Sequence, residues 1–448
     1  MDATIYAVIT GNWDREIQGV VGHSNIVFGK QAAAYGFDGI VPEAVVHPGS
    51  VGELSEVIRI AHGRRLAVIP RGAGTKMGIG YPPTRADLIL ALNRLDKIGE
   101  YTPDDMTVTT DAGVTLGALQ DRLNSKGQFL PLDPPYSRAT TVGGTLATNA
   151  SGPSRCAYGT ARDYLIGIKV VQPDGKVTSF GGKVVKNVAG YDLQKLYIGS
   201  LGTLGVIVEA NFKVCPQPEA SATLIVPLPD LELVGRISEG LVDSDLSPTM
   251  VELIGSTMVQ RILLDDVAHT GNQLVISFEG VKEAVAWQVE QAQAMVRDLD
   301  TFASDPLHGE SATRLRASVR ELPARADVSF ACRANLLPSM VVQFCKKAEC
   351  IIDKVDVAGG IMAHAMDGIV YVLMWDVPLH GVTELVNSLL RVAIHCGGNM
   401  TVERAPAEIK DKLPVWGAVR DDFKLMGLIK EKMDPSRILN PGRFVAGI

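Results

Sequence analysis

A glycine-rich loop near residue 70 has the residue types that hold an anion. The apolar stretch Leu66–Pro70 predicts a buried strand, which runs directly into Arg71–Gly78. Gly72 and Gly74 permit positive φ and a close backbone approach, so successive N–H groups can converge on a ligand, and the arginine and lysine of the loop add positive charge. A diphosphate would suit this loop, although a tight turn without a ligand would fit the same residues. The Walker ending and the Rossmann GxGxxG spacing are both missing, so a nicotinamide cofactor is the weaker interpretation.

Three later segments are rich in small residues, where backbone could lie against a flat ring. They are Asp133–Pro135, Thr140–Gly152 and Gly199–Ile207. Between the last two, Tyr158-Gly159 adds a further glycine, and Pro173–Gly175 predicts a hairpin turn. Together with the first loop, these segments favour a bound ligand over an empty turn.

In this order and spacing, the segments resemble the FAD-binding domain shared by vanillyl-alcohol oxidase, p-cresol methylhydroxylase and the FAD-linked hydroxy-acid dehydrogenases. The resemblance covers about Gly39 to Pro218, with a matching tail at Asn440–Arg443. It implies that the first loop wraps the FAD pyrophosphate and that the later segments pass along the pyrophosphate and the isoalloxazine. Several members attach FAD covalently through a histidine at the fifth position of the loop, which is Thr75 here, so we expect non-covalent FAD. The residues implied for FAD binding are Pro70, Arg71, Gly72, Ala73, Gly74, Thr75, Lys76, Met77, Gly78, Pro134, Thr141, Val142, Gly143, Gly144, Asn149, Ala150, Ser151, Gly152, Tyr158, Gly159, Gly202, Gly205, Val206, Ile207, Asn440 and Arg443.

One further stretch, Gly181–Leu193, looks like a signature of the FAD-binding subunit of bacterial glycolate oxidase. The alternative is that its polar residues, Lys186, Asn187, Tyr191 and Asp192, form a turn that caps the following segment. The resemblance implies a sister FAD-linked oxidase subunit and an iron–sulfur subunit as partners.

The catalytic dehydrogenases of this superfamily usually carry an HxGDGNxH metal motif, followed by Glu-His-Gly. The nearest match is His364–Tyr371, in which Tyr371 replaces the second histidine, and Arg404 stands where the later histidine would be. Loss of one imidazole removes one of the residues that would bind the metal, so we predict no bound metal. His364, Tyr371 and Arg404 are nevertheless the candidate catalytic residues. His364 is expected as a hydrogen-bonded core or cleft histidine, and Arg404 either clamps a carboxylate or forms a structural ion pair.

Composition limits the remaining possibilities. The chain has 448 residues, which predicts at least two domains, and its net charge of −7 gives no overall attraction to nucleic acid. Six scattered cysteines without a CxxC pair exclude an iron–sulfur cluster held by this chain alone. Neither a secretion signal nor a transmembrane segment is recognisable, so we expect a cytoplasmic protein, or one held at the inner face of the membrane through partners.

The elements that must position these residues change character near residue 218. Before it, short strands (Thr107–Asp111, Gly167–Val171, Gly205–Val214) alternate with helices (Val51–His62, Leu116–Lys126). After it, long amphipathic helices (Leu231–Leu241, Lys282–Leu299, Pro338–Lys354, Val382–His395) separate strands at Thr223–Val226, Gln273–Glu279, Asp327–Cys332 and Ile369–Trp375. We predict an α+β protein with a two-lobed PCMH-type FAD-binding domain and an α/β cap of one sheet covered on one side by helices. The expected divisions are residues 1–38, 39–218, 219–400 and 401–448, the last returning to the FAD-binding domain.

Three functions follow. The first is the FAD-binding subunit of a glycolate oxidase-like complex, taking part in electron transfer from a small 2-hydroxy acid to an iron–sulfur partner. The second is a self-sufficient FAD-dependent D-2-hydroxy-acid dehydrogenase, acting on glycolate or D-lactate. The third is a flavin-free scaffold subunit.

Overall fold

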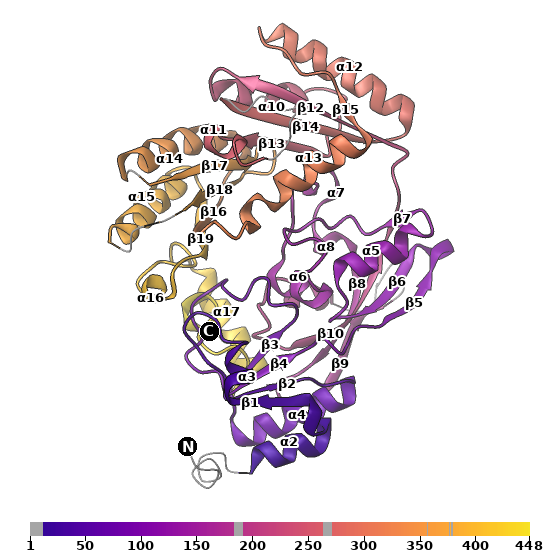
Figure 1. The fold of residues 1–448 in the computed structure, drawn as a ribbon, viewed down its shortest axis with the longest axis vertical. Helices are drawn as coiled ribbons and strands as arrows, with labels where there is room; N and C mark the ends of the chain where they lie inside the picture. The colour runs from indigo at the N-terminus through magenta and orange to yellow at the C-terminus, as the bar shows by residue number, and fades with distance from the viewer. Residues whose placement is uncertain (1–11, 183–190, 263–270, 356, 376, 378–379) are drawn as a thin grey trace.

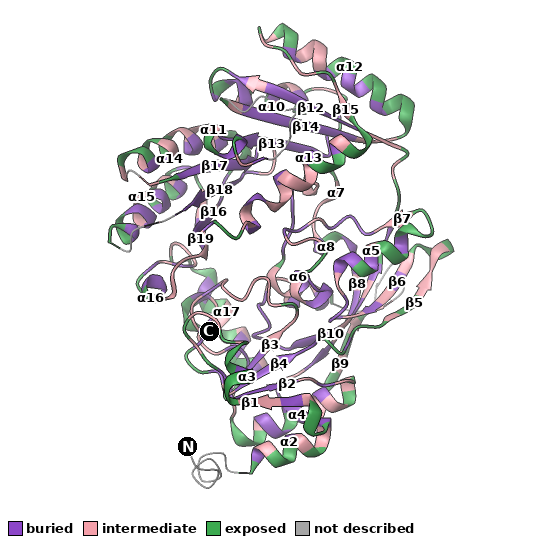
Figure 2. Ribbon diagram, viewed as in Figure 1, coloured by how far each residue is buried: buried purple, intermediate pink, exposed green. Residues whose placement is uncertain are grey.

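The computed structural model describes residues 12–182, 191–262, 271–355, 357–375, 377 and 380–448. Two halves follow each other along the chain, one in indigo to magenta and the other in pink to orange, and the yellow C-terminal helix lies beside the first half (Figure 1). In both halves the strands are mostly buried and the helices expose one side (Figure 2).

The first half begins with a four-stranded sheet of order β1-β2-β4-β3. Its strands are β1 (Ile26–Phe28), β2 (Ala44–Val46), β3 (Val68–Arg71) and β4 (Leu88–Ala91), and its helices are α2 (Trp13–Val21), α3 (Gly29–Ala33) and α4 (Val51–Arg64). Strands β2, β3 and β4 are parallel. Helix α4 begins where the Ser50 side chain accepts a hydrogen bond from the Glu53 N–H, and it buries Leu54, Ile58 and Ala61 at helical spacing. This packing fixes β3, and therefore the glycine loop that follows it.

A second, antiparallel sheet completes the first half, with the order β5-β6-β10-β8-β9. Its strands are β5 (Ile98–Thr102), β6 (Thr107–Asp111), β8 (Leu165–Val171), β9 (Val177–Gly181) and β10 (Val206–Lys213). Strands β7 (Gln128–Phe129) and β11 (Cys215–Pro216) form a separate pair, and the helices are α5 (Leu116–Asn124), α6 (Val142–Thr148), α7 (Arg155–Tyr158), α8 (Ala161–Tyr164) and α9 (Gln194–Tyr197). The predicted hairpin turn joins β8 to β9, with Gly175 at φ 88°.

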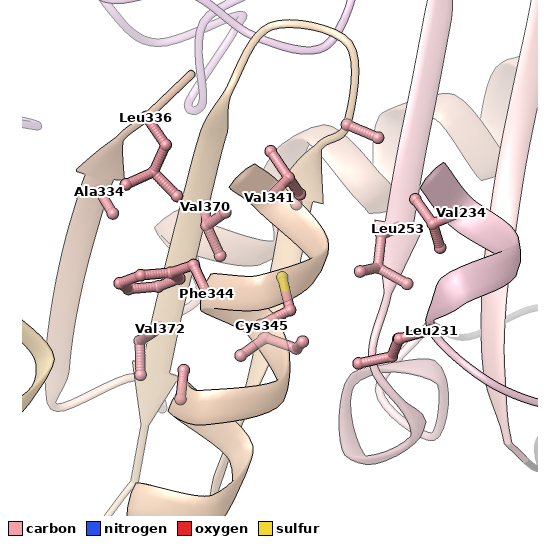
Figure 3. Close-up of a cluster of buried hydrophobic side chains, with 14 of the residues drawn as sticks. Leu231, Val234, Leu253, Ala334, Leu336, Val341, Phe344, Cys345, Val370 and Val372 are labelled. Atoms are coloured by element: carbon pink, nitrogen blue, oxygen red, sulfur yellow. The ribbon is translucent and has the colours of Figure 1, made fainter. Parts of the chain in front are cut away.

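The cap is an antiparallel sheet of eight strands in the order β15-β12-β14-β13-β17-β18-β16-β19. The strands are β12 (Ala220–Leu228), β13 (Met250–Ile254), β14 (Asn272–Gly280), β15 (Leu307–His308), β16 (Phe330–Asn335), β17 (Gly359–His364), β18 (Ile369–Met374) and β19 (Asn399–Arg404). Its main core joins the sheet to α10 (Glu232–Val242), α12 (Lys282–Asp298), α14 (Val341–Val355) and α15 (Val382–His395). Figure 3 shows Phe344 and Cys345 of α14 packed beside Val370 and Val372 of β18.

The opposite face of the cap sheet is also buried. The predicted covering of one face by helices is therefore observed, and a second core covers the other face. Side chains alternate along β13, where Val251 and Leu253 join the main core and Met250 and Ile254 join a second one. Helices α11 (Ser256–Val259) and α13 (Gly309–Glu321) contribute to this second core. Helix α7 of the first half also packs against β13, so this face meets the FAD-binding half.

The C-terminal segment returns to the first half through α16 (Ala407–Lys410) and α17 (Asp422–Met433). Leu439 forms a parallel bridge with Val68 of β3, and Lys430 of α17 is fully buried. The expected division after residue 400 falls inside β19, which pairs with β16 of the cap. We therefore propose that the cap extends to Arg404.

Candidate functional site

The glycine loop after β3 meets sequence-distant segments around two adjoining cavities. The first, of about 70 Å³, is lined by residues 72–77, by Thr141 and Gly144 at the start of α6, and by Arg443 of the tail. The second, of about 50 Å³, adds Gly143 and the segment that leads into β10, including Gly202, Gly205, Val206 and Ile207. The structure thus brings together four of the segments that the sequence analysis assigned to FAD.

The glycines that line these cavities leave room for a bound group to lie close to the backbone. A Cβ atom at Gly72 would lie 2.1 Å from Thr141 Oγ1, and Gly74 and Gly202 have φ of +80° and +69°, a conformation that favours glycine. Arg443 holds the loop from behind, donating to the carbonyls of Met77 at 2.5 Å and Ile79 at 2.7 Å. Its Nε is buried without a hydrogen-bond partner among the described residues. A shaped backbone with an unsatisfied donor fits an anionic cofactor such as FAD.

The small-residue run after residue 140 is helical over its first part, as α6. Thr141 accepts a hydrogen bond from the Gly144 N–H at 3.2 Å, which begins α6, and Asn149 in the left-handed conformation ends it. Further on, the Gly152 N–H donates to the buried carboxyl of Asp133 at 3.1 Å.

Some expected FAD residues lie outside the two loop cavities. The expected residues that do not line them are Gly78, Pro134, Val142, Asn149, Ala150, Ser151, Gly152, Tyr158 and Gly159. Gly78 lines a small cavity toward the cap, and Tyr158 lines a larger cavity between the two halves. Its hydroxyl donates to Glu279 of the cap at 3.0 Å. Asn440 does not line them either, but its amide donates to the Leu201 carbonyl at 2.6 Å.

On the cap face that meets the FAD-binding half, polar side chains from neighbouring strands lie in a row. Glu252 of β13 lies opposite His364 of β17, and Arg333 of β16 lies opposite Tyr371 of β18. His364 Nδ1 is 2.6 Å from Glu252 Oε1, and the His364 and Tyr371 rings meet edge to face at 5.6 Å. Arg333 forms an ion pair of 3.2 Å with Glu403 of β19. His364 and Tyr371 are therefore neighbours, as the motif predicts, and His364 is a hydrogen-bonded buried histidine.

Burial sets the proton affinities of this row. It lowers the pKa of His364 to about 4, against an opposing effect of Asp367 and Asp133. It also raises the pKa of Glu252 well above its usual value, with the same two carboxyls acting in the same direction. The imidazole is therefore neutral near pH 7, and the raised affinity for a proton lies on Glu252.

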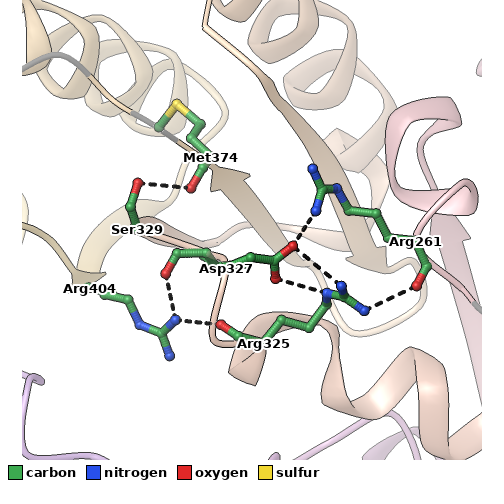
Figure 4. A network of polar contacts seen from close by, with 7 residues as sticks. Arg261, Arg325, Asp327, Ser329, Met374 and Arg404 are labelled. Atoms are coloured by element: carbon green, nitrogen blue, oxygen red, sulfur yellow. Dashed lines mark hydrogen bonds and ion pairs between the residues drawn. The ribbon is translucent and has the colours of Figure 1, made fainter.

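Arg404 is held by carbonyl groups rather than by an ion pair. Its NH1 donates to the backbone oxygens of Arg325 at 2.8 Å and Val328 at 2.7 Å (Figure 4), and its NH2 donates to the Tyr136 hydroxyl at 2.9 Å. No carboxylate forms an ion pair with it in the part of the chain that the structure describes. In Figure 4, Asp327 instead pairs with Arg325 and Arg261. Among the described residues Arg404 therefore makes hydrogen bonds and no ion pair, and its role in binding a carboxylate stays a prediction.

Two cavities separate the FAD-binding half from the cap. The smaller, of about 70 Å³, lies between Thr75, Lys76 and Tyr136 on one side and Glu403 and Arg404 on the other. The larger, of about 430 Å³, is lined from the cap by residues that include Glu279, Arg316 and Arg320. Glu252, Arg333 and these α13 arginines were not predicted from the sequence. Only Glu252 carried a signal, as a single acid inside an apolar run.

Two expectations remain outside what the structure tests. Lys183 to Gly190, the centre of the glycolate oxidase-like stretch, lies outside the described residues; beyond it Tyr191 is exposed and Asp192 pairs with Lys195 at 2.7 Å. Among the described residues, no group of three or more His, Cys, Asp or Glu side chains could hold a metal. None of the helices described is long and apolar enough to cross a membrane.

Comparison with known protein families identifies both halves of the chain. Residues 42–181 match the FAD binding domain, and residues 217–444, half of the chain, match the C-terminal domain of FAD linked oxidases. The chain belongs to the FAD-linked oxidases: it is an oxidoreductase, and its cofactor is FAD. The expected family, the α+β fold and the flavin are all confirmed.

Two relatives match about nine-tenths of the chain. The chain is 28% identical over 422 residues to the glycolate oxidase subunit GlcD of Bacillus subtilis, covering 91% of this chain and 89% of that protein. It is 29% identical over 420 residues to a D-lactate dehydrogenase of Archaeoglobus fulgidus, covering 90% and 91%. A crystal structure of p-cresol methylhydroxylase superposes with a TM-score of 0.77 at 18% identity over 97% of both chains, which shows the shared fold.

Proposed function

We propose that this chain is the FAD-bearing subunit of a glycolate oxidase-like complex and that it oxidises a small 2-hydroxy acid. The observation that carries the proposal is the buried His364–Glu252 pair, at 2.6 Å, on the cap face that meets the FAD-binding half. Relatives named as a glycolate oxidase subunit and as D-lactate dehydrogenases support this substrate class.

In this function FAD supplies hydride acceptance from the carbon that bears the hydroxyl group. The chain must then take the hydroxyl proton. His364 is neutral near pH 7, with a pKa of about 4, and it can take that proton on one ring nitrogen as the other passes a proton to Glu252, whose raised pKa gives the pair its proton affinity. Tyr371 packs against the edge of the same ring, and Arg404 orients the acid from its fixed guanidinium.

Electrons then leave through a partner. The cysteines of the chain lie scattered, and three of them, Cys332, Cys345 and Cys396, are buried in the cap core, so no cluster can assemble on them. We propose an iron–sulfur subunit as the acceptor, beside a sister FAD-linked subunit. The complex would lie in the cytoplasm, or at the inner face of the membrane through its partners.

A self-sufficient D-2-hydroxy-acid dehydrogenase is the second candidate, favoured by the match to D-lactate dehydrogenases over nine-tenths of the chain. The flavin-free scaffold has no support, because the family and the loop cavities both indicate FAD.

Steady-state turnover separates the two candidates. The purified chain with its FAD is supplied with glycolate or D-lactate and a soluble dye, then with its iron–sulfur partner instead of the dye. The complex predicts electron transfer to the partner at a rate at least equal to that with the dye. Failure of the partner to accept electrons, with full dye activity, would favour the self-sufficient enzyme.

A further inference from the structure

Two cations without a carboxylate partner line the small cavity between the glycine loop and the cap. These are Lys76 of the loop and Arg404 of β19. Lys76 forms neither a hydrogen bond nor an ion pair with any described residue, and burial lowers its pKa. Lys76 is half-buried, so its ammonium group is partly removed from water, and a bound anion would stabilise it there.

The acids close to this cavity are already paired. Glu403 forms its ion pair with Arg333. Glu321, at the end of α13, lies 3.1 Å from Arg320 Nε and also accepts hydrogen bonds from the backbone N–H groups of Tyr136 at 2.6 Å and Ser137 at 3.2 Å. Lys76 and Arg404 are therefore the surplus positive charge.

Lys76 lines this cavity together with charged residues of the cap. Burial has the largest effect on the pKa of Lys76, and the charged groups that also shift it, Glu403, Arg333, Glu321 and Arg404, all belong to the cap. The first loop cavity has a further cation, Arg443, whose Nε has no hydrogen-bond partner among the described residues. Lys76 lines the small cavity toward the cap as well as the first loop cavity, so a ligand between the two halves can contact it.

Tyr136 adds a neutral donor. Its hydroxyl accepts from Arg404 NH2 at 2.9 Å, so its own proton is directed to no described acceptor. Its backbone has φ of 61°, an unfavourable value for a bulky side chain, and the two hydrogen bonds to Glu321 hold it there. The cavity of about 70 Å³ has room for roughly two water molecules, which is the scale of one carboxylate group.

We infer that Lys76, Tyr136 and Arg404 form a binding site for the carboxylate of a small organic acid, with Lys76 as the principal ligand. The inference rests on the proposed function, because it assigns this site to the carboxylate of the 2-hydroxy acid.

Binding of oxalate to the FAD-loaded protein tests the site without turnover, because oxalate has no C–H bond to give. Oxalate is titrated at constant ionic strength, and the change in the flavin absorbance gives its Kd. The Lys76→Met variant should weaken binding at least tenfold, Lys76→Arg should stay within about threefold, and Tyr136→Phe should weaken it severalfold. Lys126→Met, at an exposed lysine after α5, is the matched control and should bind as the unmodified protein does. FAD content should be equal in all variants.

Unchanged oxalate binding in Lys76→Met would overturn the inference, as would an unmodified protein that does not bind oxalate. Loss of FAD from Lys76→Met would also overturn it, because Lys76 would then serve the cofactor. The proposed function can fail on its own. If the protein binds oxalate through Lys76 but no 2-hydroxy acid reduces its flavin, the binding site is supported and the proposed function is contradicted. Reduction by D-lactate that is insensitive to Lys76→Met would remove the site and keep the function.

Discussion

His364 Nδ1 lies 2.6 Å from Glu252 Oε1, and both side chains are buried between the cap sheet and the FAD-binding half. The residues are 112 positions apart in the chain, and the pairing of β13 with β17 places them opposite each other. In this setting burial disfavours charge on either group, so the pair changes its protonation as a unit.

This coupling predicts a pH dependence for the oxidation. The form that can accept a proton has Glu252 ionised and His364 neutral, so kcat/KM should rise with pH through the raised pKa of Glu252. Glu252→Gln removes that ionisation. It should lower kcat/KM by about 100-fold and abolish this rise, because general base catalysis typically contributes at least that much. Glu239→Gln, at an exposed position of α10, is the control. The same pH profile in Glu252→Gln and the unmodified protein would exclude the pair as the base.

Thr75 at the fifth position of the glycine loop predicts that FAD is released when the protein is denatured. After acid precipitation, the yellow flavin should remain in the supernatant, and the mass of the precipitated chain should equal that of its sequence. Flavin that stays with the precipitated chain would contradict non-covalent binding.

Contact between the glycine loop and α6 predicts a specific loss of FAD. In Gly72→Ala the new methyl group would lie 2.1 Å from Thr141 Oγ1, so either the loop or the N-cap of α6 must move. FAD per chain should fall several-fold. Gly63→Ala is the matched control, because nothing lies within 4 Å of a Cβ there and alanine should stabilise α4 by about 0.5–1 kcal/mol. Equal FAD content in the two variants would argue against a cofactor at the loop.

The buried Lys430–Asp434 pair predicts how the tail is attached. Lys430 Nζ lies 2.7 Å from Asp434 and donates to the carbonyls of Thr203 at 2.8 Å and Leu439 at 2.9 Å. Lys430→Met leaves a buried carboxylate unpaired, so the free energy of unfolding should fall by about 3–5 kcal/mol. Urea denaturation measures the change, with the exposed Lys432→Met expected within about 0.5 kcal/mol of the unmodified chain. A similarly small effect in both variants would show that the tail does not depend on this pair.

Local patterns of the sequence were enough to predict most long elements. The helix expected over Lys282–Leu299 is observed as α12, and the strand Thr107–Asp111 is observed with those bounds. Strands β13, β17 and β19 were not predicted. Strand β13 is a short apolar run and β17 begins with two glycines, so neither of these two shows the alternation of apolar and polar residues that indicates a strand.

Site residues that belong to a family motif could be predicted from the sequence. Residues that reach the site only through the order of the strands could not. The glycine loop and His364 were found from their motifs. The partner of His364 was not, because only the order of the cap strands brings Glu252 to it. The cap side of Lys76 was missed for the same reason, since its cavity is closed by residues more than 300 positions later, Glu403 and Arg404.

Reduction of the bound flavin is the most direct test of the account. The FAD-loaded chain alone, without oxygen, is mixed with glycolate or D-lactate, and its absorbance near about 450 nm, where oxidised flavins absorb, is followed. At least one of these 2-hydroxy acids should bleach the flavin, and Glu252→Gln should slow the bleaching. A flavin that stays oxidised with both acids would contradict the claim that this chain performs the oxidation.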